Sequence, residues 1–235
     1  MKNILIISDG IPGHFNQSKG VASLLSKKHY SDIKIVDLEF KSHHLRGLIT
    51  VFSRFLMRLP TTLTANVTSI LYKQIDTSGF DLIIAAGGKT APYTAALRIL
   101  YNIPVIQLGS PRGLHSSLYN ALVTVERYYE DSSNIIASIT PSLYSPQVCE
   151  QAANDKGLSE HLLFLIGGEG IGYSYKENEW QDLINAIKQI YITTNLPITI
   201  VTSRRSDPEV EKKIQSELEN IPLDYSAWFH QGAKN

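Results

Sequence analysis

Residues 3–14 read NILIISDGIPGH, and this stretch decides the fold of the first part of the chain. The run from Ile4 to Ile7 is continuously apolar, which is typical of a parallel strand that is buried on both faces. Asp9-Gly10 closes the strand, and apolar residues at helical spacing follow over 15–28. A strand, a glycine turn and a helix in this order predict a βαβ unit whose loop lies at the carboxyl edge of a parallel sheet.

The same order recurs along the chain and predicts two Rossmann-like units. In the first part we expect strands over 3–8, 32–38, 80–86, 104–108 and 121–125, with a further helix over 90–101. After a connector with a short helix near 146–156, we expect strands over 162–166 and 197–202 and helices over 178–192 and 207–218. The predicted architecture is α/β: a Rossmann-like domain over 1–140 with helices on both faces of its parallel sheet, a connector over 141–160, and an incomplete second Rossmann-like domain over 161–235.

The composition is that of a globular protein. Of the 235 residues, 43% are hydrophobic and 19% are charged, which excludes a collagen-like chain and a disordered chain of high net charge. No apolar run reaches the roughly 18 residues of a membrane-spanning helix, and the first residues predict no signal peptide. Cys149 is the only cysteine. It cannot form an internal disulfide, it is expected to be buried, and it favours a cytoplasmic location.

The net charge is zero, but the charges are unevenly distributed. Residues 1–120 hold 13 basic and 6 acidic side chains, whereas residues 121–235 hold 9 and 16. A basic half and an acidic half indicate two units with different partners. The alternative is that the difference in charge arose by chance and from one pair of acidic helices. The basic residues are not concentrated in one patch, so a nucleic-acid partner is not expected.

The loop after the first strand holds the first set of candidate catalytic residues. His14 can act as a general base near neutral pH, and Asp9 is placed to orient it. Gly10 and Gly13 permit tight turns. The loop also carries two amides that can recognise hydroxyl or amide groups, Asn16 and Gln17. The alternative interpretation is a turn that starts a helix and exposes a histidine.

Two further loops follow predicted strands and carry glycines. Gly87-Gly88-Lys89-Thr90 can offer backbone N–H groups to an anion or a sugar hydroxyl, or it is a turn in which Thr90 caps the next helix. In the second part, the candidates for a diphosphate site are Gly167, Gly168, Gly170, Ser203, Arg204 and Arg205. Glycines let the backbone approach an anion, and arginines neutralise it. The alternative is a pair of solvated loops.

Residues 41–60 predict a basic amphipathic helix. Apolar residues recur there at helical spacing, and Lys41, Arg46, Arg54 and Arg58 are interleaved without an acidic residue. Such a helix can lie on an anionic membrane surface. The alternative is an ordinary helix that faces the core and has a solvated basic side.

Four motifs, in their order and spacing, resemble the elongated-mitochondria (mitochondrial fission) family. They are DGIPGHFNQ at 9–17, GGKTAP at 87–92, LIGG at 165–168 and TSRR at 202–205. The resemblance extends from Ile4 to about Gln231. Bacterial members of that family look like glycosyltransferases of the GT-B type, which have two Rossmann-like domains.

The resemblance implies a division of the site residues. The loops around His14 and 87–90 would face the acceptor, and the loops at 167–172 and 203–205 would grip the diphosphate of a nucleotide-sugar donor. It further implies a transferase of cell-envelope or surface polysaccharide synthesis that acts on a lipid-linked or saccharide acceptor without a metal or other cofactor. The sequence accordingly lacks an Asp-x-Asp motif.

Two other functions are compatible with the same resemblance: a sugar-nucleotide epimerase of the same fold, and a non-catalytic scaffold at a membrane. Related chains continue beyond the position of Asn235 into later strands that hold the donor base and ribose. The second domain is therefore expected to be partial and to leave apolar surface exposed.

Overall fold

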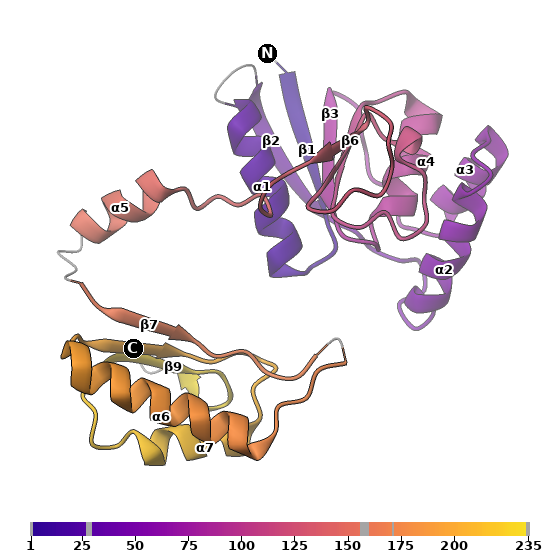
Figure 1. Ribbon diagram of the computed structural model, residues 1–235. Coiled ribbons are helices and arrows are strands. Elements are labelled where there is room, and N and C mark those ends of the chain that lie inside the picture. The colour runs from indigo at the N-terminus through magenta and orange to yellow at the C-terminus, as the bar shows by residue number, and fades with distance from the viewer. Residues whose placement is uncertain (1, 27–29, 156–159, 171, 234–235) are drawn as a thin grey trace. The chain divides into compact units, whose positions relative to one another are not determined.

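The computed structural model describes residues 2–26, 30–155, 160–170 and 172–233. The chain forms two compact units, Met1–Cys149 and Glu150–Asn235 (Figure 1), which we call the N-terminal unit and the C-terminal unit. Each unit has its own sheet and its own helices. The predicted α/β class with two Rossmann-like parts is confirmed.

The N-terminal unit is built on six parallel strands in the order β2-β1-β3-β4-β5-β6. The strands are β1 (Lys2–Ser8), β2 (Tyr30–Asp37), β3 (Leu82–Ala86), β4 (Val105–Leu108), β5 (Ala121–Thr124) and β6 (Asn134–Ile136). The chain runs from β1 to β2 and then returns to β3 on the other side of β1. The carboxyl ends of β1 and β3 therefore flank a topological switch point, which is where open α/β sheets bind ligands.

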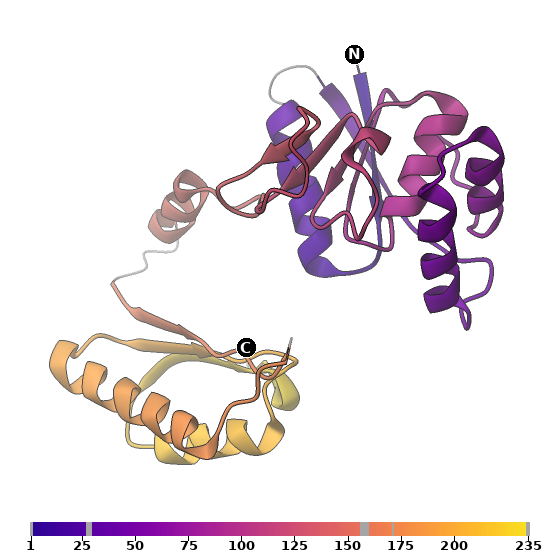
Figure 2. The same cartoon turned by 45° about the vertical axis from the view of Figure 1, so that its right-hand side comes forward.

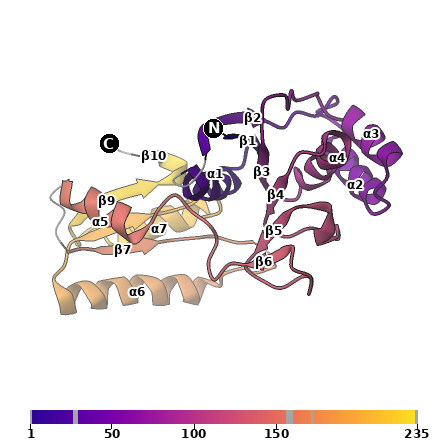
Figure 3. The ribbon, with the colours of Figure 1, turned by 90° about the horizontal axis from the view of Figure 1, so that it is seen from above.

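Helices cover both faces of this sheet, which explains the continuous apolar run in β1. Ile4 and Ile6 pack in one cluster with Ala22 of α1 (Pro12–Ser26). Leu5 and Ile7 belong to the cluster on the other face, which α2 (Arg46–Met57), α3 (Thr62–Ile70) and α4 (Ala91–Tyr101) cover. Figure 3 shows α1 on one side of the strands and the other three helices on the opposite side.

The C-terminal unit has a four-stranded sheet in the order β10-β9-β8-β7. β7 (Leu162–Leu165), β8 (Ile198–Val201) and β9 (Leu223–Trp228) are parallel, and the short β10 (Gly232–Ala233) is antiparallel to β9. Figures 1 and 2 show α6 (Glu177–Thr194) and α7 (Pro208–Glu217) on the same face of this sheet. On β7 the side chains of Leu163 and Leu165 are exposed, as the expectation of uncovered apolar surface requires.

Several elements differ from the prediction. α1 begins at Pro12 rather than Phe15, because proline is favoured in the first turn of a helix; Gly13 is therefore a helical residue, and the tight turn falls on Gly10, whose φ is +76°. The predicted helix over 41–60 is the shorter α2, and α3 starts a second helix after Thr61, whose hydroxyl accepts the Thr64 N–H at 3.2 Å.

Three strands were not predicted: β6, β9 and β10. β6 and β10 are very short, and β9 mixes polar with apolar residues, so none of the three has the continuous apolar run that marks a buried strand. The short helix of the connector is present as α5 (Pro146–Asp155), but it buries no residue. Cys149 is accordingly exposed, and the prediction that it is buried is wrong. No helix in the described part of the chain combines the length and the apolar composition needed to span a membrane.

Candidate functional site

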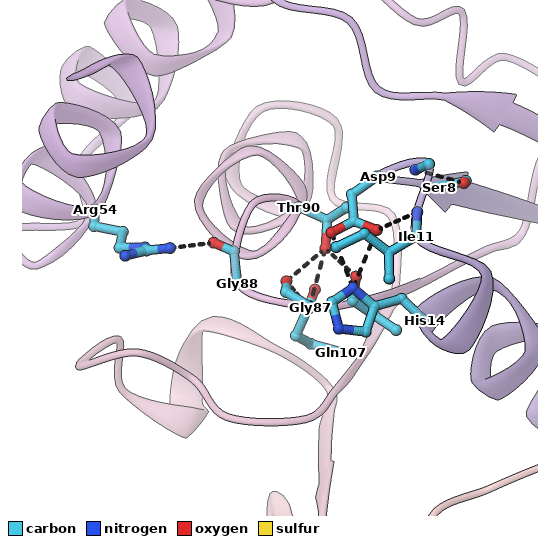
Figure 4. Close-up of polar contacts among 11 residues, drawn as sticks. Ser8, Asp9, Ile11, His14, Arg54, Gly87, Gly88, Thr90 and Gln107 are labelled. Atoms are coloured by element: carbon cyan, nitrogen blue, oxygen red, sulfur yellow. Dashed lines mark hydrogen bonds and ion pairs between the residues drawn. The ribbon is translucent and has the colours of Figure 1, made fainter. Parts of the chain in front are cut away.

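The side chains of Asp9 and His14 are in hydrogen-bond contact at the carboxyl end of β1 (Figure 4). The His14 Nδ1 lies 2.9 Å from Asp9 Oδ2 and 3.1 Å from Oδ1. The Asp9 side chain is 1% exposed and the His14 side chain 32% exposed. A buried carboxylate that accepts a hydrogen bond from Nδ1–H fixes the orientation and the tautomer of the ring. This leaves Nε2 as the basic nitrogen, so the pair can remove a proton from a ligand.

Gly87, at the end of the neighbouring strand β3, makes room for this pair. A Cβ atom at Gly87 would lie 2.3 Å from His14 Nδ1 and 3.0 Å from Asp9 Oδ2. Its φ is +90°, which side chains rarely adopt. The loops after β1 and β3 therefore pack directly on each other, and a glycine is required where they meet.

A network of buried hydrogen bonds fixes the position of the Gly87 loop. Gln107 of β4 donates from Nε2 to the Gly87 carbonyl oxygen at 3.1 Å, and the Thr90 hydroxyl donates to the same oxygen at 2.9 Å. The Thr94 hydroxyl donates to Gln107 Oε1 at 3.0 Å. Thr90 occupies the N-cap position of α4 as predicted, but its side chain makes no cap hydrogen bond. Its hydroxyl instead fixes the loop, and Gln107 is a positioning residue that sequence analysis missed.

Other predicted acceptor-side residues are Gly13, Asn16 and Gln17, which lie in α1 after Asp9, and Lys89 after β3. Asn16 and Gln17 lie in the first half of α1, are half-buried, and make no side-chain hydrogen bond within the described residues. Gly13 has open space where a side chain would stand. Lys89 is half-buried and lines a cavity together with Asp9. Of these candidates, Lys89 is the one that shares a cavity with Asp9.

Two arginines beside Gly88 were not predicted for the site. Arg54 of α2 donates from Nη2 to the Gly88 carbonyl oxygen at 2.9 Å (Figure 4). A Cβ at Gly88 would lie 2.8 Å from Cγ of Arg112 and 3.0 Å from Nη2 of Arg54. Burial, and then the positive charge of Arg112, lower the pKa of Arg54. Arg112 lies in the loop after β4, and ligands bind at the carboxyl ends of parallel strands, so its position in the sequence could have identified it. Arg54 lies in a helix, and its sequence position does not indicate a role in the site.

The glycine and arginine loops of the C-terminal unit form one corner. A Cβ at Gly168 would lie 1.6 Å from the Arg205 carbonyl oxygen, so only glycine fits there. The Ser206 hydroxyl lies 3.0 Å from the Gly167 carbonyl oxygen. The Arg205 side chain lies beside Gly170, with Nη1 3.0 Å from the position of a Cβ. The two loops therefore pack together, as their adjacent strands β7 and β8 require.

The outer residues of this corner are held by hydrogen bonds or are exposed. The Ser203 hydroxyl accepts the Arg205 N–H at 3.2 Å, so its role in the structure is to shape the loop. Arg204 and Arg205 are both exposed. Exposed guanidinium groups beside a glycine backbone are suited to bind a diphosphate.

A buried carboxylate braces the same loop and was not predicted. Glu211 of α7 is fully buried and accepts the Thr202 hydroxyl at 2.6 Å and the His230 N–H at 3.3 Å. The His230 Nε2 in turn lies 2.7 Å from the Ser206 carbonyl oxygen. These bonds connect both ends of the 203–206 loop to α7 and the segment after β9. Glu211 appears in the sequence as one of several glutamates of an acidic helix, and only the fold distinguishes it.

Comparison with solved structures finds 25 chains that match, and three of those that cover nearly the whole of this chain are described below. The UDP-GlcNAc 2-epimerase from Methanocaldococcus jannaschii has a TM-score of 0.53 at 12% identity, over 96% of this chain and 74% of that protein. MurG from Acinetobacter baumannii has a TM-score of 0.48 at 15% identity, over 95% and 64%. UGT2 from Phytolacca americana, complexed with UDP-2fluoro-glucose and pterostilbene, has a TM-score of 0.47 at 10% identity, over 98% and 72%.

At 12% identity, the similarity to the Methanocaldococcus jannaschii structure shows a shared fold alone. The chain spans 64% of the length of the MurG structure, and no curated protein matches its sequence. The match to a protein family is more extensive, because residues 12–235 fit the family described as Mitochondrial fission ELM1. That match includes all four motifs apart from the first three residues of DGIPGHFNQ. The chain therefore belongs to the mitochondrial fission ELM1 family.

Proposed function

We propose that the protein is a nucleotide-sugar-dependent glycosyltransferase whose general base is His14. The observation that carries this proposal is the Asp9–His14 pair at the switch point of the N-terminal sheet. His14 Nε2 takes the proton of an acceptor hydroxyl, and the hydroxyl oxygen bonds to the anomeric carbon of the donor. The bond from that carbon to the diphosphate breaks, and the diphosphate leaves with the electron pair. The buried Asp9 carboxylate stabilises the imidazolium that forms.

The corner of the C-terminal unit is the proposed donor site. Arg204 and Arg205 would neutralise the diphosphate, and the backbone of 167–170 would lie against it. The close packing of Gly168 on Arg205 and the brace through Glu211 hold this corner in a fixed shape. Fixed charges stabilise a leaving group best, because they need no reorganisation during the reaction.

We further propose that α2 and α3 attach the protein to an anionic membrane surface during cell-envelope or surface polysaccharide synthesis. Ile49 and Met57 of α2 are buried, but Leu48, Phe52 and Phe55 are exposed, the last by 62%. The apolar stripe is thus wider than the core-facing side, which favours the membrane interpretation over an ordinary core helix. The expectation that Arg54 belongs to the basic membrane-facing side is wrong, because its guanidinium binds Gly88.

The proposal is tested by incubating the chain with a panel of nucleotide sugars and separating the products by chromatography. A transferase releases nucleoside diphosphate when an acceptor is present. Conversion of one nucleotide sugar into another without an acceptor would instead establish an epimerase. Binding of neither nucleotide sugars nor nucleoside diphosphates, measured by calorimetry, would reject both enzymes and favour a scaffold.

A further inference from the structure

Basic side chains converge beside the Asp9–His14 pair without enough acidic partners. A cavity of about 510 Å³ is lined by Asp9 and by four positively charged residues, Lys41, Arg46, Lys73 and Lys89. Of its two carboxylates, Glu39 pairs with Lys73 and Asp9 pairs with His14. Within the described residues Lys41, Arg46 and Lys89 form no ion pair, so the cavity carries uncompensated positive charge.

A second cavity extends this positive region towards α2. It has a volume of about 310 Å³, shares Arg46 and Lys89 with the first cavity, and is lined by Arg54 as well. Arg112 approaches Arg54 across Gly88. We call Lys41, Arg46, Arg54, Lys89 and Arg112 the cationic hollow.

The cationic hollow is partly shielded from solvent, although Lys41, Arg46 and Arg112 are exposed. Arg54 and Lys89 are half-buried, and Arg54 Nε is buried without a hydrogen-bond partner in the structure. Like charges at short distance in a partly buried place repel one another unless an anion lies between them. An anion with several oxygen atoms would accept hydrogen bonds from these side chains and remove the repulsion.

An apolar groove adjoins the hollow on the same helix. It has a volume of about 570 Å³ and is lined by exposed residues of α2 that include Leu48, Val51, Phe52 and Phe55. Val51 lines both this groove and the second basic cavity. A ligand that fills both places has an anionic group at the carboxyl edge of the sheet and a hydrocarbon part along α2.

We propose that the cationic hollow binds the phosphate or diphosphate of a lipid-linked acceptor whose hydrocarbon lies in the apolar groove. This inference rests on the proposed transferase function and narrows its acceptor to an amphiphile. The anion lies next to Asp9, so the hydroxyl that reacts at His14 is close to the phosphate. Both cavities belong to the N-terminal unit, which keeps this anion site separate from the proposed donor site.

Calorimetry on the full chain with farnesyl diphosphate, pyrophosphate and UDP tests the inference. We expect farnesyl diphosphate to bind at least about tenfold more tightly than pyrophosphate, because the hydrocarbon adds apolar burial. The double variant Arg46→Gln/Lys89→Gln should weaken both ligands about tenfold or more. The variant Phe52→Ser/Phe55→Ser should weaken only farnesyl diphosphate. UDP binding should be unchanged in both.

A matched control removes two exposed charges elsewhere in the same unit, through Lys34→Gln/Arg127→Gln, and should leave all three affinities unchanged. If Arg46→Gln/Lys89→Gln fails to fold by circular dichroism, Lys89→Gln alone serves. Equal affinity for farnesyl diphosphate and pyrophosphate would overturn the lipid assignment and leave a site for free anions. Unchanged binding after loss of Arg46 and Lys89 would overturn the anion site. The parent chain separates this inference from the proposed function: absence of transfer in the transferase assay together with intact farnesyl diphosphate binding rejects the function and not the site.

Discussion

At the scale of single residues, the Asp9–His14 pair could be predicted from the sequence, whereas the arginines beside Gly88 could not. Asp9 and His14 are five positions apart across the start of a helix, so local geometry brings them together. Arg54 and Arg112 meet at Gly88 because α2 and the loop after β4 pack around the β3 loop. That proximity depends on the packing of distant segments, which a helical pattern around 41–60 does not encode.

Replacing His14 by alanine should lower turnover by about 10²-fold or more, since general-base catalysis contributes that much. Asp9→Asn should also lower turnover, because an amide does not hold the His14 ring in the tautomer that leaves Nε2 free to accept a proton. Steady-state kinetics measures both effects, and calorimetry should show unchanged UDP affinity. Normal turnover by His14→Ala would contradict the assignment.

Gly87→Ala should destabilise the N-terminal unit by about 1–3 kcal/mol, because a Cβ meets the His14 ring and φ is unfavourable for alanine. Gly47→Ala is the matched control: it lies in α2 with open space at its Cβ. This change should be neutral or stabilise by up to about 1 kcal/mol. Denaturant unfolding distinguishes the two, and equal free energies of unfolding would refute the close packing of the β1 and β3 loops.

At the scale of elements, apolar periodicity predicted the central strands and the long helices, because these bury continuous apolar faces. It failed for β6, which has only three residues, and for β9, in which the core residues Leu223 and Trp228 are separated by polar ones. The same periodicity predicted one helix over 41–60, whereas α2 ends at Met57 and a turn follows it. The periodicity of 41–60 is compatible with a core helix and with a surface helix, and only the exposed fractions of its residues separate the two.

The membrane proposal is tested on α2 itself. Phe52→Ser/Phe55→Ser should abolish co-sedimentation with vesicles of phosphatidylcholine and phosphatidylglycerol, because binding at an interface depends on buried apolar area. Leu24→Ser on α1 removes another exposed apolar side chain and should leave binding intact. Co-sedimentation that is equal in all three proteins, or absent in the parent, would reject this contact.

At the scale of the whole molecule, the uneven charge has a different origin in each unit. In the C-terminal unit, α6 and α7 both begin with glutamates and are joined by Lys188–Glu217 and Lys213–Glu177, which fits the alternative of an acidic helix pair. In the N-terminal unit, five basic side chains line the two cavities beside Asp9 and α2. Net charge alone predicted neither arrangement, because it does not say on which face the side chains lie.

The proposed donor site of the C-terminal unit can be tested by its affinity for UDP. The double variant Arg204→Ala/Arg205→Ala should weaken UDP binding by about tenfold or more, because charge-assisted bonds to the diphosphate are lost. Lys212→Ala, on the exposed surface of α7 in an ion pair with Glu209, is the matched control and should bind like the parent. Calorimetry gives both affinities, and equal affinity in the double variant would show that the diphosphate lies elsewhere.

The most direct measurement of the central claim is acceptor-dependent release of nucleoside diphosphate from a nucleotide sugar by the full chain. The account predicts release only when donor and lipid-phosphate acceptor are both present. It also predicts loss of at least about 99% of that rate in His14→Ala, in line with removal of a general base. Release at the same rate by the parent and by His14→Ala would contradict the claim that the Asp9–His14 pair performs the chemistry.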